Sequence, residues 1–186
     1  MDKDVSAGSG ITTVAGRLAL GITLLAFGLG HTAVIDGVSA ADAASIAQWV
    51  GGVALFAAGL LSLREGDAAG GTAFTVLGAL WFTWAVSDAA AGNGAGVFLL
   101  LFALVALSLT LAGGDQLGRG AHGLFCVSLL LLAIAAFADS DGLAKAGGWF
   151  AVAAGAVAWY AATAALAHWP TALPRRAAGR GVTATG

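Results

Sequence analysis

Charged side chains are scarce in this 186-residue sequence, which carries eight Lys or Arg and ten Asp or Glu. They make up 10% of the residues, whereas a water-soluble domain carries about 25%. Apolar residues reach 59%, so too little polar surface exists to cover a soluble core, and a soluble globular protein is excluded. The formal net charge of −2 also excludes a strongly basic surface for nucleic acid.

Cysteine is almost absent, because Cys126 is the only one. A single cysteine inside an apolar stretch forms neither a disulfide framework nor a cysteine metal site. The three histidines, His31, His122 and His168, show no metal-ligand spacing. The sequence also lacks a nucleophile elbow, a phosphate loop and a metalloprotease helix. We therefore expect no enzyme activity, no cofactor and no metal site.

Six apolar stretches, each close to the length of about 20 residues that crosses a bilayer, fill most of the chain. They predict an all-α polytopic membrane protein with six transmembrane helices in one bundle. The expected organisation is a cytoplasmic segment over residues 1–13, a transmembrane domain over 14–168 and a short cytoplasmic tail over 169–186. The predicted spans are Val14–Ile35, Ala44–Leu63, Gly71–Ala91, Ala95–Gly113, Gly120–Ala138 and Ala146–Ala167.

The basic residues indicate the orientation. Only Lys145 falls on one side of the predicted membrane, and the other seven Lys or Arg fall on the opposite side. By the positive-inside rule, both termini are expected in the cytoplasm, with the plasma membrane as the location. The seven are Lys3, Arg17, Arg64, Arg119, Arg175, Arg176 and Arg180.

Glycine is abundant, with 29 residues, and many lie inside the spans. Several are spaced seven apart, which is close to two helical turns and places each pair on one face. Such small-residue faces let transmembrane helices approach closely. They indicate either packing within one bundle or, alternatively, a pore lining or a subunit interface. The pairs are Gly21/Gly28, Gly52/Gly59, Gly71/Gly78 and Gly148/Gly155.

No Asp or Glu lies deep in any span, which disfavours a relay of carboxylates and favours a pore for a small neutral or anionic solute. Thr72 and Thr75 lie three residues apart, on one face of the third predicted helix, and offer hydroxyls to an anion or water. His31, near the end of the first span, is a candidate proton site or an interfacial histidine.

Two neighbouring runs carry a resemblance to a known family. AGLLSLREGD over Ala58–Asp67 and GTAFTVLGALW over Gly71–Trp81 resemble the passage that joins the second and third helices of the acetate uptake transporter family, the succinate/acetate permeases. Further matches are Gly148-Trp149, Gly155 and Tyr160. The resemblance implies six helices, a hexamer and a pore through each protomer that passes acetate and related short carboxylates.

The resemblance also implies a hydrophobic constriction, which in this sequence corresponds to Leu20, Leu77 and Leu129. The chain departs from the family in two places: its first helix lacks the Asn-Pro-x-Pro-Leu-Gly motif, and Ser62 replaces a glutamate. The residues expected along the substrate path are Thr23, Thr72, Thr75, Trp81 and Tyr160.

Together these observations predict transport of acetate or a related short-chain carboxylate through a pore in each protomer. Coupling of this transport to protons stays open. The expected partners are the solute, the lipid bilayer and further copies of the chain in a homo-hexamer. The alternatives are a channel for another small solute and a structural or regulatory membrane protein that transports nothing.

Overall fold

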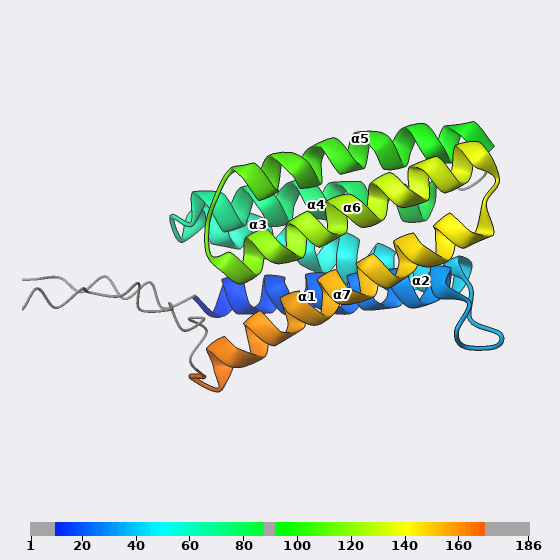
Figure 1. The fold of residues 1–186 in the computed structure, drawn as a ribbon. Coiled ribbons are helices and arrows are strands. Elements are labelled where there is room, and N and C mark those ends of the chain that lie inside the picture. The colour runs from blue at the N-terminus through cyan, green and yellow to red at the C-terminus, as the bar shows by residue number, and fades with distance from the viewer. Residues whose placement is uncertain (1–9, 88–91, 170–186) are drawn as a thin grey trace, which may run out of the picture.

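The computed structural model describes residues 10–87 and 92–169, which form a helical bundle (Figure 1). Six helices of the described chain are long and apolar enough to cross a membrane, so the predicted all-α fold with six spans is confirmed. The second span, Ala40–Arg64, consists of three consecutive elements. Residues 1–9 and 170–186, most of the two predicted cytoplasmic segments, lie outside the described residues. The elements are α1 (Ile11–Thr32), α2 (Ala40–Ile46), η1 (Ala47–Ala54), α3 (Leu55–Arg64), α4 (Ala68–Val86), α5 (Gly92–Leu111), α6 (Gln116–Ala138) and α7 (Asp141–Leu166).

All six spans begin earlier than hydropathy predicts, and polar side chains cap the first turns of α4, α6 and α7. Asp67 precedes α4 and accepts a hydrogen bond from the Gly70 amide at 2.9 Å. Asp115 caps α6 through the Gly118 amide at 3.1 Å. Ser140 caps α7 in the same way. A capping side chain satisfies backbone donors that the first turn leaves free, so each helix gains a polar turn that an apolar window does not detect.

The bundle brings both described ends of the chain to one end of the molecule, together with the turns before α4 and α6 (Figure 1). The most extensive packing is between α1 and α7, followed by α6 with α7 and α5 with α6. On the other side of the bundle, α4 packs against η1 and α3. Six helix ends therefore meet at this end of the bundle: the starts of α1, α4 and α6 and the ends of α3, α5 and α7.

The glycine pairs of the first and last spans face each other. A Cβ built on Gly28 would lie 2.7 Å from the carbonyl oxygen of Gly148, and one on Gly148 would lie 2.9 Å from that of Gly28. Gly21 and Gly155 have the same reciprocal relationship, with 3.2 and 2.9 Å. The two glycine faces thus let the backbones of α1 and α7 touch, as small residues do in membrane bundles.

The other two glycine pairs join the second span to α4. Gly59 lies against the backbone of Thr75, and a Cβ on Gly78 would come within 2.6 Å of the Phe56 amide nitrogen. Gly52 and Gly71 contact Phe82 and Leu63 in the same interface. All four predicted pairs therefore serve packing inside one protomer, the first of the two readings that the sequence left open.

The second span is not a regular α-helix. Residues 47–54 form the π-helical stretch η1 between α2 and α3. Gly51 of η1 lies where a Cβ would come 2.5 Å from the Thr23 methyl carbon and 3.1 Å from the Trp81 ring. Such π-helical turns occur often at functional sites. Hydropathy alone predicts a plain transmembrane helix here and gives no sign of the π-helical turns.

Candidate solute path

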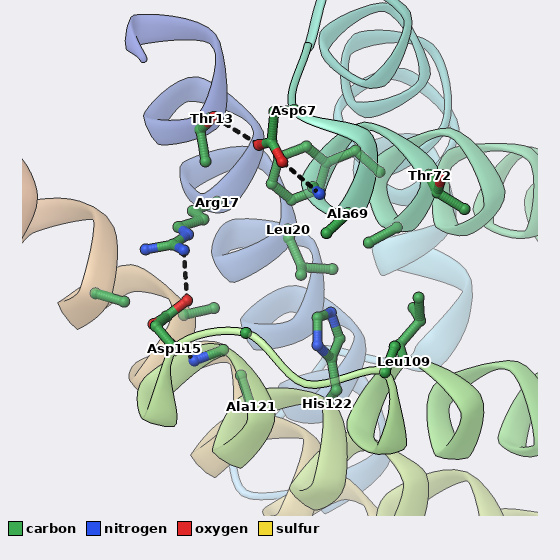
Figure 2. Close-up of a pocket in the computed structure, with 18 of the residues that line it drawn as sticks. Thr13, Arg17, Leu20, Asp67, Ala69, Thr72, Leu109, Asp115, Ala121 and His122 are labelled. Carbon is green, nitrogen blue, oxygen red and sulfur yellow. Dashed lines mark hydrogen bonds and ion pairs between the residues drawn. The ribbon is translucent and has the colours of Figure 1, made fainter. Parts of the chain in front are cut away.

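A cavity of about 560 Å³ opens at the end of the bundle where these helix ends meet (Figure 2). Its polar side chains come from α1, α4 and α6 and the turns before them, while α5 and α7 contribute small and apolar residues. These polar lining residues are Thr13, Arg17, Asp67, Thr72, Asp115 and His122.

Asp67 ties the starts of α1 and α4 together on one wall of the cavity. One of its carboxylate oxygens caps α4 at Gly70, and the other accepts a hydrogen bond from the Thr13 hydroxyl at 3.1 Å. The positive end of the helix dipole stabilises a carboxylate at this position. Both oxygens of Asp67 are thus already engaged.

Arg17 and Asp115 face each other at the cavity (Figure 2). The Nη2 atom of Arg17 lies 2.6 Å from Oδ1 of Asp115, while Oδ2 accepts from the Gly118 amide. Their side chains are 25% and 46% exposed, so the pair is open to solvent. This ion pair links α1 to the turn between α5 and α6, elements far apart in sequence.

His122 extends from α6 into the same cavity (Figure 2). Its Nε2 atom is buried and has no hydrogen-bond partner within residues 10–87 and 92–169. A neutral imidazole donates from one ring nitrogen and accepts at the other. His122 therefore offers the cavity a polar atom that the described residues leave unsatisfied.

The cavity borders the buried apolar core at Leu20 and Phe74. Leu20 lines the cavity and also belongs to one continuous buried cluster with Leu77 and Leu129. Their exposed fractions are 3%, 0% and 0%. The three residues that the family resemblance assigned to a constriction thus all belong to the buried apolar core, and Leu20 is the one that lines the cavity.

Aromatic rings fill the next part of this core around Trp81, which is fully buried. Its indole packs edge-on against Phe27 and Phe102 and stacks on Phe125 at a centroid distance of 5.6 Å. The indole nitrogen Nε1 is buried without an acceptor in the described part of the chain. A buried indole N–H usually has a hydrogen-bond partner, so Trp81 offers the core a donor that the described residues leave unused.

The predicted threonines lie in three different settings. Thr72 lines the cavity. Thr75 lies in the interface with α3, against Gly59, and its buried hydroxyl has no partner among the described residues. Thr23 is buried, and its hydroxyl donates to the Ala19 carbonyl 2.8 Å away, as serine and threonine commonly do in helices.

The structure does not bring Tyr160 to the other predicted path residues. Its side chain is 40% exposed on the outer face of α7, near Trp169. The buried face of this helix consists of small residues such as Gly155, Ala158 and Ala162, which allow α1 and α6 to approach. A tyrosine on that face would hold the helices apart.

His31 lies towards the far end of α1, away from the cavity. Its Nδ1 atom is 2.8 Å from the Phe27 carbonyl oxygen, and its ring packs on that of Phe27 at 4.4 Å. Through Phe27, the histidine contacts the aromatic cluster around Trp81. Within the described ranges, no three His, Cys, Asp or Glu side chains gather closely enough to hold a metal ion.

Of the polar residues that line the cavity, the sequence predicted Thr72 as a path residue but not Thr13, Arg17, Asp67, Asp115 and His122. The available signal was that Arg17 and His122 are ionisable residues inside spans, which by default indicates a functional site. The sequence does not show that the turn before α6 returns to α1. Only the fold places Asp115 opposite Arg17.

Comparisons with known proteins agree with this architecture. The sequence profile of the GPR1/FUN34/yaaH family matches residues 10–172. A glyoxylate pathway regulator from Yarrowia lipolytica is 27% identical over 168 residues, an alignment that covers 82% of this chain and 62% of that relative. The solved structure of the bacterial acetate channel SatP has the same fold, with a TM-score of 0.77 and 24% identity, over 84% of this chain and 92% of that one.

Proposed function

This chain belongs to the GPR1/FUN34/yaaH family, the acetate transporter family that its sequence resembles, and from that membership we propose that it carries acetate or a related short-chain carboxylate across a membrane. The solute crosses through a path inside each protomer. The observation that carries the proposal is the polar cavity that borders the buried apolar core at Leu20 and Phe74.

The path has two parts with different tasks. The cavity admits a hydrated solute and offers it the side chains of Arg17, Thr72 and His122. The apolar core beyond, with Leu20, Leu77 and Leu129, forms the gate, because a hydrophobic constriction closes by losing its water. Leu77 and Leu129 are fully buried here, which fits a closed gate.

The dry core constrains the form in which a carboxylate crosses. An isolated carboxylate is costly to desolvate unless a charge or hydrogen bonds compensate it. Among the described residues, the buried polar side chains are threonines and serines, with no Lys or Arg. We infer that either the protonated acid crosses or hydrogen-bond donors such as the Trp81 indole replace part of the water. The first route moves a proton with each solute molecule. His31, towards the far end of α1, is the candidate side chain that binds or releases this proton.

The finer features follow from the resemblance and the charge pattern. We propose a homo-hexamer in the plasma membrane, with both termini in the cytoplasm, so that the cavity opens to the cytoplasm. The glycine faces no longer support the hexamer, since they are used inside the protomer. Its support is therefore the family alone.

Uptake of radiolabelled acetate into liposomes that contain the purified protein tests the proposal. We expect uptake well above that of protein-free liposomes, and competition by unlabelled propionate. Flux of glycerol or urea without flux of acetate would indicate a channel for another solute. If no small solute crosses, the protein is a sealed structural or regulatory membrane protein, a role in line with the name of the Yarrowia relative.

A further inference from the structure

Arg17 is the one arginine or lysine among the described residues that line the cavity. It lies six residues after the start of α1, about 9 Å along the axis at 1.5 Å per residue. An arginine inside a span is energetically costly and usually faces a water-filled cavity or a charged partner. Here it faces both.

The two carboxylates in the cavity, Asp67 and Asp115, do not prevent an anion from binding at Arg17. Asp67 and Asp115 each cap a helix, and each uses one oxygen for that cap. The helix dipole offsets part of their negative charge. The second oxygen of Asp67 accepts a hydrogen bond from the Thr13 hydroxyl, and the second oxygen of Asp115 accepts one from Arg17.

The Arg17 guanidinium is only partly used by this ion pair. A guanidinium has five N–H donors in a planar fork that matches a carboxylate with two parallel hydrogen bonds. The contact with Asp115 engages Nη2 alone among the atoms described. Since nearly half of the Asp115 side chain is exposed, water competes with the contact, and such open pairs are weak.

We propose that Arg17 and His122 form a carboxylate-binding site in the cavity, and that Asp115 is a resident carboxylate that the solute displaces from Arg17. The site rests on the proposed function, because it takes the same class of solute. Arg17 holds the carboxylate through its fork, and the Nε2 atom of His122, when protonated, donates from the facing helix α6. Asp115 then keeps its bond to the Gly118 amide and turns its other oxygen to water.

The site selects for a carboxylate but not for its length. The cavity volume of about 560 Å³ leaves room for the solute, its aliphatic part and several waters. Discrimination by size therefore falls to the leucine core, and discrimination by charge falls to Arg17. Short monocarboxylates and dicarboxylates both fit this first site.

Four variants in liposomes test the site, with initial rates of acetate uptake measured over a range of concentrations. Arg17→Gln removes the charge, and Arg17→Lys keeps the charge without the fork. Asp115→Asn removes the competing carboxylate and keeps an N-cap side chain. Arg119→Gln is the matched control, because Arg119 is exposed on α6 and lies outside the cavity lining.

We expect Arg17→Gln to raise the KM for acetate about tenfold, the effect of one charge-assisted hydrogen-bonded contact. Arg17→Lys should fall between Arg17→Gln and the wild type, and Asp115→Asn should lower the KM severalfold. Arg119→Gln should match the wild type. An unchanged KM in Arg17→Gln, or an equal rise in Arg119→Gln, overturns the site. A raised KM in Asp115→Asn overturns the displacement.

A binding measurement separates this site from transport itself. Saturation-transfer NMR on ¹³C-acetate with the protein in nanodiscs should show binding to the wild type and to Arg119→Gln, and its loss in Arg17→Gln. Binding without flux in the wild type would contradict the proposed function and support the site. Flux with no Arg17-dependent binding would do the reverse. If Arg17→Gln does not fold, Arg17→Lys and Asp115→Asn decide by the same criteria.

Discussion

Gly28 of α1 and Gly148 of α7 lie back to back, each so close to the carbonyl oxygen of the other that neither position has room for a Cβ. This contact and its counterpart at Gly21 and Gly155 hold the first and last spans together along their length. In a membrane, where lipid removes the hydrophobic drive between helices, close backbone contact supplies much of the stability.

Gly148→Ala should therefore destabilise the protein, because the added methyl group forces α1 and α7 apart. Overpacking of this kind costs about 1–3 kcal/mol. The measurement is the midpoint of thermal unfolding in mild detergent. Gly120→Ala is the matched control, since Gly120 lies in α6 with nothing within 4 Å of the added atom. Equal midpoints for the two variants would show that the contact is not tight.

Leu77→Ala should widen the gate. The side chain is fully buried, and its loss costs about 2–5 kcal/mol of stability. It should also raise acetate flux, or admit larger solutes such as butyrate, because a wider apolar gap holds water more readily. Leu107→Ala, on the exposed face of α5, is the control. A Leu77→Ala protein that folds but keeps wild-type rate and selectivity would place the gate elsewhere.

Trp81→Phe tests the unpartnered indole N–H in the core. The substitution keeps an aromatic ring against Phe125 and removes a donor that has no acceptor among the described residues. We expect the missing donor to change stability little. Acetate flux should fall severalfold, since a carboxyl group in the core loses a hydrogen bond. Trp84→Phe, in the same aromatic cluster, should leave flux nearly unchanged. Equal flux in both variants would exclude this role for the indole.

Thr72 and Thr75 should behave differently although they share a helix. Thr72→Val removes a hydroxyl from the cavity wall and should raise the KM for acetate a few-fold. Thr75→Val replaces a buried hydroxyl that has no described partner by a group of the same shape, so uptake should stay the same and the thermal midpoint should hold or rise. A loss of uptake confined to Thr75→Val would assign the solute path to the α3–α4 interface.

The seven-to-one distribution of basic residues predicts cytoplasmic termini. Alkaline phosphatase is active only outside the cytoplasm, and green fluorescent protein folds inside it. A fusion of each to the C-terminus should therefore give fluorescence without phosphatase activity. A reporter placed in the turn around Asp139 should give the opposite result, and phosphatase activity at the C-terminus would invert the orientation.

The sequence was sufficient to predict the number of spans, because apolar stretches between short polar turns leave few alternatives in a membrane. It also predicted which glycines share a face. It did not predict that Gly28 meets Gly148, since helical periodicity describes one helix and not its neighbour. The three leucines came from the family resemblance, and the structure puts them in one cluster.

The predictions for the polar residues were less successful, for a physical reason. Thr72 and Thr75 lie three residues apart on one helix, yet that spacing still separates them by about 60° around the axis. One faces the cavity and the other faces α3. Similarly, Tyr160 was expected along the substrate path, but α7 buries only its small residues and turns this ring outward.

The π-helical stretch η1 lies between the two α-helical parts of the second span, so its winding decides how α2 and α3 are turned relative to each other. A π-helix joins residues five apart and an α-helix joins residues four apart, so each residue of η1 turns the chain by less than the roughly 100° of an α-helix. Gly51 meets Thr23 and Trp81 on one side of this stretch, and Gly59 meets Thr75 beyond it. If residues 47–54 were rewound as an α-helix of the same length, Gly51 would turn relative to Gly59 and the two contacts could not both form. The second span therefore depends on its winding as well as on its glycines, since both couple the aromatic core to the α3–α4 interface.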